Sequence, residues 1–146
     1  MEIADLTHGT NPLLLDLALL VGRVAIGICF MIHAFGKLGL VGNGSMEGFA
    51  AWLADLGLPM PAVQARMAMV SELVGGALLA LGLATRPAAL VLIATMLVAG
   101  IVGHRGAGYL ITNDPPGAEY TLNLAVVCLM FLLIGPGSIS LDALLF

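Results

Sequence analysis

The sequence predicts an all-α integral membrane protein, folded as a four-helix bundle with a short interfacial helix between helices one and two. The 146 residues are 60% hydrophobic and only 10% charged, whereas soluble domains carry about 25% charged residues. The mean hydropathy is +1.09. A spanning helix needs about 20 predominantly apolar residues, and four stretches of the sequence meet this requirement. Since backbone groups in lipid must bond within their own helix, residues 1–146 are expected to form one antiparallel transmembrane domain.

Proline, glycine and turn residues bound the four expected spanning helices. Asn11-Pro12 precedes the first helix, the turn Ala-Thr-Arg-Pro at 84–87 separates the second from the third, and Gly-Pro-Gly at 135–137 follows the fourth. Proline fits the first turn of a helix, and glycine and proline commonly end one. The expected helices cover about residues 13–36, 62–83, 87–104 and 119–134.

The first connection contains the expected interfacial helix, at about residues 45–56. Phe49, Trp52, Leu53 and Leu56 recur at i, i+3, i+4 and i+7, which is the pattern of an amphipathic helix. Tryptophan is enriched at the level of lipid headgroups, so Trp52 is expected there. The third connection is rich in glycine and proline and is expected to form an ordered loop or a lid on the same side.

Two charged residues lie deep in the apolar runs, Arg23 in the first helix and Glu72 in the second. Charges at bilayer depth are costly, so they are usually paired or functional. Counting inward at 1.5 Å per residue puts the two at similar depths, and we predict an Arg23–Glu72 ion pair near the midplane. Such a pair can serve function or can only fix helix packing. Gly75-Gly76 would let the first helix approach closely.

The other polar candidates gather at one end of the predicted bundle. His33 and Lys37 share a face of the first helix, His104 ends the third, and Glu119 opens the fourth, with Asn123 one turn later. We therefore predict a polar pocket. In it, His33 and Lys37 would contact a ligand headgroup and His104 and Glu119 would relay protons, since histidine titrates near neutrality. Arg23, Glu72 and Asn123 would complete the binding site.

A quinone suits such a pocket, because its carbonyls accept hydrogen bonds and its ring and tail fit an apolar groove. No closely spaced histidine pair or cysteine cluster indicates metal, haem or an iron–sulfur centre. Cys29 and Cys128 are expected to pack as small hydrophobic residues.

Four segments, in order along nearly the whole chain, resemble the DoxX family. They are "RVAIGICFMIHAFGKL" (23–38), "GFAAWLADLGLPMP" (48–61), "AMVSELVGGALLALGLATRPAAL" (68–90) and "GPGSISLD" (135–142). Family members commonly read His-Gly where this chain has His33-Ala34. The resemblance implies a four-helix inner-membrane protein related to quinol oxidase and thiosulfate:quinone oxidoreductase activities. Residues that match the family motifs are Arg23, His33, Lys37 and Glu72, with His104 and Glu119 placed by position.

Three functions follow from these observations. The first is a redox-linked membrane subunit whose pocket between helices binds a quinone or similar amphiphile. The second is a non-catalytic anchor or assembly factor for a partner protein that carries the redox centre, and the third is a small-molecule or proton transporter. The expected partners are the lipid bilayer, that redox protein and further copies of the chain. Nucleic acid is excluded, because the net charge is −4 and no basic cluster occurs. The expected location is a bacterial inner membrane, with an orientation that the few cations do not decide.

Overall fold

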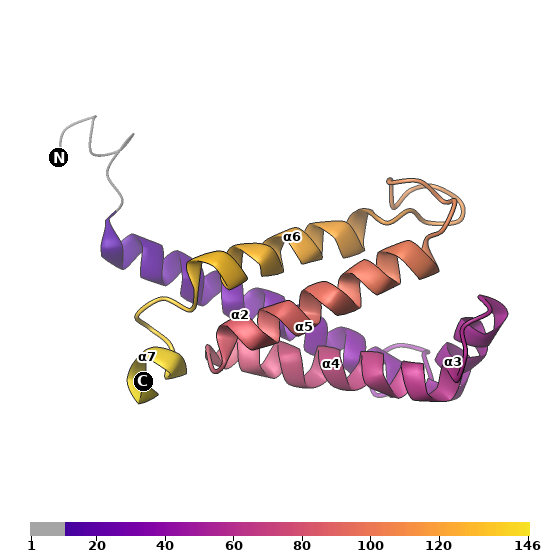
Figure 1. Cartoon of the computed structure of the whole chain (residues 1–146), viewed down its shortest axis with the longest axis horizontal. Coiled ribbons are helices and arrows are strands. Elements are labelled where there is room, and N and C mark those ends of the chain that lie inside the picture. Colours follow the sequence, from indigo (N-terminus) through magenta and orange to yellow (C-terminus); the bar gives the residue numbers. More distant parts are fainter. Residues whose placement is uncertain (1–10) are drawn as a thin grey trace.

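The computed structural model of the protein describes residues 11–146, in which all regular secondary structure is helical. The described part of the chain starts with the long helix α2 and ends with the short helix α7 (Figure 1). The elements are α2 (Pro12–Lys37), α3 (Met46–Asp55), α4 (Pro61–Leu81), α5 (Thr85–Val98), the π-helix η1 (Ala99–Gly103), α6 (Glu119–Ile134) and α7 (Leu141–Leu145).

The predicted helices are present, with small differences at their ends. The range 119–134 is confirmed, and the first, second and interfacial helices lie within two residues of expectation. The third helix begins at Thr85 rather than Pro87, because proline is tolerated throughout a first turn whose N–H groups have no partner within the helix. Its last turn is the π-helix η1, and α7 was not expected.

Three of these helices are long and apolar enough to cross a membrane: α2, α4, and α5 together with η1. Helix α6 is equally apolar but has only 16 residues. Within residues 11–146, α4 packs between α2 and α5, and α5 packs against α6 (Figure 1). The short helix α3 lies against α4, at the opposite end of the molecule from α7 (Figure 1). The regular structure of residues 11–146 is thus all helical and is consistent with a helical membrane protein.

Two glycines bring α2 and α4 into backbone contact. A Cβ atom added to Gly76 would lie 2.7 Å from the carbonyl oxygen of Gly27, and one added to Gly27 would meet the Gly76 carbonyl in turn. Small residues at helix interfaces in membranes permit this approach. The predicted close approach at Gly75-Gly76 is therefore confirmed for Gly76. Gly75 instead faces Leu92 of α5.

The same contact explains why the predicted Arg23–Glu72 ion pair does not form. In antiparallel helices with Gly27 opposite Gly76, Arg23 lies level with residue 80, eight residues from Glu72. Eight residues correspond to about 12 Å along the axis. The prediction counted the depth of Arg23 from Lys37 and the depth of Glu72 from the start of the second helix. These two starting points are not level, because α4 begins farther out than Lys37. Glu72 pairs with Lys37, and Arg23 donates to the carbonyl oxygen of Ile139 at 2.5 Å.

Arg23 lies in a corner where the C-terminal segment returns to the helices. Its side chain is only 1% exposed, and a Cβ atom on Gly82 would collide with it. Asp142 accepts hydrogen bonds from the backbone N–H groups of Ala84 and Thr85, at 2.7 and 2.9 Å, and so caps α5 from a distance. Asp16 of α2 accepts from the backbone and side chain of Ser138. These contacts fasten α7 to the bundle.

Replacing Asp142 with alanine is expected to lower the free energy of unfolding in detergent by about 1 kcal/mol at pH 7, as for lost helix caps. Partial burial opposes ionisation, but hydrogen bonds from Thr85 and Ala84 and the charge of Arg23 outweigh it, so the pKa of Asp142 lies below its usual value. A depressed pKa stabilises the fold above the unfolded pKa, and this contribution is lost as the pH falls through the folded pKa.

The difference between wild type and the variant should therefore shrink on acidification below about pH 4, the ordinary range of an aspartate pKa. Thermal unfolding followed by circular dichroism at pH 7 and pH 3 measures it. A difference that stays constant or grows would contradict this role of the carboxylate.

Candidate functional site

A cavity of about 630 Å³ lies at the α3 end of the helices, between α2, α3, α4, α5, η1 and α6. Most of its wall is apolar, from residues such as Phe30, Leu53, Met96 and Leu124. The polar lining residues are His33, Lys37, Gln64, Ser71, Glu72, Thr95, Tyr120 and Thr121. A largely apolar cavity with a few polar side chains is the usual form of a site for a small organic ligand.

An ion pair joins two of the helices in the cavity wall. Lys37 Nζ of α2 lies 2.5 Å from Glu72 Oε2 of α4, and their side chains are 18% and 6% exposed. The ammonium also lies 5.2 Å from the ring centroid of Phe49 on α3, within cation–π range. Lys37 thus connects α2 to α4 and α3, and an ammonium in one such pair keeps N–H groups for a ligand.

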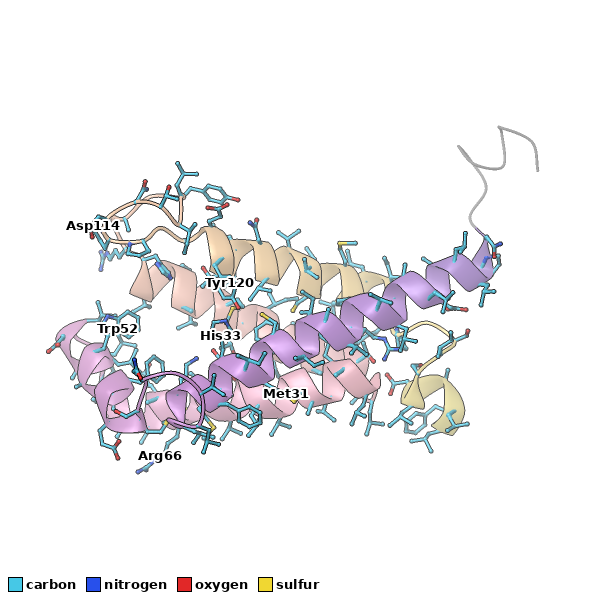
Figure 2. All side chains as sticks on the ribbon, turned by 180° about the vertical axis from the view of Figure 1, so that it is seen from behind. Met31, His33, Trp52, Arg66, Asp114 and Tyr120 are labelled. Carbon is cyan, nitrogen blue, oxygen red and sulfur yellow. The ribbon has the colours of Figure 1, made fainter. Side chains whose placement is uncertain are left out.

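His33 and Tyr120 lie together on the cavity wall where α2 passes α6 (Figure 2). Their ring centroids are 5.0 Å apart and their planes are tilted by 47°. The hydroxyl of Tyr120 lies 3.0 Å from the sulfur of Cys29, one turn before His33. An imidazole and a phenol side by side can each donate or accept a hydrogen bond, so this wall can bind a ligand carbonyl or hydroxyl.

Two hydroxyl groups close the wall between α4 and α5. Ser71 Oγ lies 2.9 Å from Thr95 Oγ1. Each hydroxyl also lies 2.9 Å from a carbonyl oxygen of its own helix, Ala68 for Ser71 and Val91 for Thr95. Hydroxyl pairs between apolar helices stabilise packing in membranes.

The π-helix and α3 form the end of the cavity. Ala99, Val102 and Gly103 of η1 line it, and π-helical turns often mark functional sites. Trp52 of α3 also lines the cavity, with its ring so close to Gly103 that an added Cβ atom would lie 2.8 Å from it. Trp52, expected at the headgroup level, therefore also forms part of the cavity wall.

Three predicted site residues lie outside the cavity, in or beside the connection from η1 to α6. His104 Nδ1 lies 2.6 Å from the Pro116 carbonyl, and the Glu119 carboxylate accepts from the backbone N–H of Ile111 at 3.0 Å. Asn123 accepts from the hydroxyl of Tyr109 at 3.1 Å. These bonds order the connection, because each joins two parts of the same loop or the loop to α6.

The structure thus brings together three of the predicted site residues, namely His33, Lys37 and Glu72, while Arg23 lies at the other end of α2. Sequence reasoning missed Tyr120, whose position at a helix start is typical of an interfacial aromatic residue. It also missed Ser71 and Thr95, although small polar residues in apolar helices often mark helix contacts.

The cysteines do not meet each other. Cys128 is buried in the apolar core, as expected, and Cys29 is half-buried beside Tyr120. In the part of the chain that the structure describes, no group of three or more histidine, cysteine, aspartate and glutamate residues is placed to hold a metal ion.

Comparisons with known proteins agree with this architecture. The sequence profile of the DoxX family matches residues 18–105, which include most of α2, all of α3 to η1 and the Lys37–Glu72 pair. The chain is 33% identical over 129 residues to inner membrane protein YphA of Escherichia coli (strain K12), covering 85% of this chain and 87% of that relative. No solved structure gives a significant match. The chain is therefore a member of the DoxX family of integral membrane proteins.

Proposed function

We propose that the cavity binds the headgroup of a quinone or a similar amphiphile. In this proposal the protein is a redox-linked membrane subunit, located in a bacterial inner membrane. The observation that carries this proposal is a mainly apolar cavity whose wall presents an ion pair, an imidazole and a phenol from three helices. The volume of about 630 Å³ lies within the range of small-molecule sites.

The residues fit a quinone in two respects. Lys37 keeps N–H groups beyond its bond to Glu72, and His33 can donate to a second acceptor, so two carbonyl oxygens could be bound. Phe30 and Leu124 offer apolar surface to the ring and the first part of a tail. Proton exchange would use His33 and Tyr120, which adjoin each other in the wall. His104 and Glu119, which order the connection, would act on this site only indirectly.

Quinone binding is expected to quench the fluorescence of Trp52 in a saturable manner, because Trp52 lines the cavity and is the single tryptophan of the chain. The probe is a short-chain quinone analogue titrated into the detergent-purified protein. His33→Ala should weaken binding about tenfold, since one hydrogen bond contributes about 1.4 kcal/mol at the upper end of the usual range. His104→Ala is the matched control, because His104 binds the Pro116 carbonyl outside the cavity.

Quenching without saturation, or equal weakening by both histidine variants, would remove the support for a quinone site.

We also propose that α6 spans the membrane, which makes four spans. Its 16 residues extend about 24 Å, somewhat less than the roughly 30 Å hydrocarbon core, a mismatch that bilayers accommodate. Reporter proteins fused after residue 112 and after residue 146 should then report opposite sides of the membrane. The same side for both fusions would show that α6 does not cross.

An anchor for a partner redox protein is the second candidate. It is favoured by Tyr109, Leu110 and Ile111, which are half-exposed on a connection held by internal hydrogen bonds. Affinity purification after mild solubilisation tests it. We expect the wild type to recover a cofactor-carrying protein, and we expect this protein to be lost when all three residues are changed to serine. Unchanged recovery with the triple variant would count against this surface.

A further inference from the structure

A second hollow, of about 590 Å³, lies on the outer face of α4 and α5. Side chains that line it include Val70, Val74 and Leu78 of α4, and Pro87 and Ala88 of α5. Such an apolar face on helices that cross the bilayer is in contact with lipid. The hollow is therefore open to molecules dissolved in the membrane.

Three residues line both this second hollow and the cavity described above, namely Met67, Ser71 and Val91. The two hollows therefore adjoin each other at residues one turn apart on α4 and at Val91 on α5. Met67 and Val91 are 66% and 47% exposed, so neither is fixed by close packing on all sides. Methionine has three rotatable bonds and adapts readily to a new neighbour.

The hydrogen bond between Ser71 and Thr95, which joins α4 to α5 between the two hollows, is easily exchanged. Ser71 and Thr95 make three contacts of hydrogen-bond length, one to each other and one each to a carbonyl oxygen of their own helix. Two hydroxyl groups carry only two hydrogens, so at most two of the three bonds exist at once. If α4 and α5 separate here, each hydroxyl still has its backbone acceptor, and no polar group is left unpaired.

From these observations we infer that a lipophilic ligand enters the cavity sideways from the bilayer, between α4 and α5, past Met67 and Val91. This route rests on the proposed function, since it supplies the same cavity with a neutral molecule of the quinone class. The opening lies at the level of the Ser71–Thr95 contact. This contact holds α4 and α5 together and is called the latch. A ligand that partitions into lipid would then reach Lys37 and Glu72 without passing through water.

A reversible disulfide at the latch tests this route. The two hydroxyl oxygens are 2.9 Å apart, so sulfur atoms at the same positions can reach the roughly 2.0 Å of a disulfide. The variant is Ser71→Cys with Thr95→Cys, in a background with Cys29→Ala and Cys128→Ala. It is reconstituted into vesicles and mixed with vesicles that carry the quinone analogue, and the quenching of Trp52 is followed with time.

Oxidation should slow the quenching at least tenfold. Treatment of the oxidised protein with dithiothreitol, which is removed before the quinone vesicles are added, should restore the rate. The single variant Ser71→Cys in the same background, treated with the same oxidant, should keep its rate. Equal rates before and after reduction of the double variant would overturn the lateral route, even if the analogue binds at equilibrium.

A second probe judges the route independently of quinone binding, so that the two proposals can fail separately. In the same cysteine-free background, Thr121→Cys places a thiol on the α6 wall of the cavity, and a lipid-dissolved alkyl maleimide labels it. Val91→Phe should slow labelling at least fivefold, whereas Leu97→Phe should not, because Leu97 is on the same helix and lines neither hollow. Equal labelling rates in the two phenylalanine variants would exclude entry between α4 and α5. If the double cysteine variant in its reduced form shows no quenching of Trp52 at equilibrium, that result would instead exclude only quinone binding and not the route.

Discussion

Replacing Lys37 with methionine is expected to lower the free energy of unfolding by about 3 kcal/mol, the lower end of the range for breaking a buried ion pair. The loss is large because it leaves Glu72 in an apolar wall with a side chain that is only 6% exposed. Lys37 remains 18% accessible, which is why the lower end of the range applies. Part of the loss comes from the contact between the ammonium and the ring of Phe49.

The double variant Lys37→Met with Glu72→Met should recover most of this loss, because both charges are then removed and the apolar wall is continuous. Unfolding of the wild type, the two single variants and the double variant by titration with a denaturing detergent gives the coupling energy. Losses that simply add would show that the two side chains act independently. Lys37→Arg is the conservative control, since it keeps the charge beside Glu72.

The same set of variants separates a structural from a functional role of the pair. A stable double variant that no longer binds the quinone analogue would mean that the charges serve the ligand rather than the packing. A stable double variant that binds as well as the wild type would assign the pair to helix packing alone. Stability and binding therefore have to be measured on the same preparations.

The helices could be predicted because their signals are local. Apolar runs and the prolines and glycines at their ends set the limits of α2, α4, α5 and α6 to within a few residues. The short helix α3 could be predicted from an apolar stripe with a period of one helical turn. Helix α7 was missed because it has only five residues, and a helix that short depends on contacts made elsewhere in the fold, such as the cap by Asp142.

The pairing of side chains depends on helix register, which no local signal gives. Depth counted from the helix ends placed Glu72 beside Arg23. With Gly27 opposite Gly76, Glu72 instead lies closer to the level of Lys37 than to that of Arg23, and it pairs with Lys37. His33 could be chosen from the sequence because it shares a face with Lys37. Tyr120 could not, since its partner His33 is 87 positions earlier and on another helix.

Gly27→Leu is expected to prevent assembly of α2 against α4, and Gly27→Ala to lower the free energy of unfolding by about 3 kcal/mol, the upper end for overpacking. The reason is that even one methyl group at Gly27 would meet the Gly76 carbonyl and lie 2.8 Å from the backbone nitrogen of Ala80. Backbone atoms cannot move aside by changing rotamer, so one helix would have to shift as a whole.

Gly36→Ala is the matched control, because Gly36 lies on the same helix and its added methyl group would be 3.7 Å from its nearest neighbour, the Val41 carbonyl oxygen. Alanine favours a helix over glycine by about 1 kcal/mol, so this variant should be as stable as the wild type or more so. Detergent-induced unfolding of the three variants measures the difference. Since the Gly27–Gly76 contact also sets the level of Glu72 against Lys37, a shifted helix should lose the ion pair too. Adding Lys37→Met to Gly27→Ala should then cost less than Lys37→Met alone, and full additivity of the two losses would contradict the link between helix contact and site.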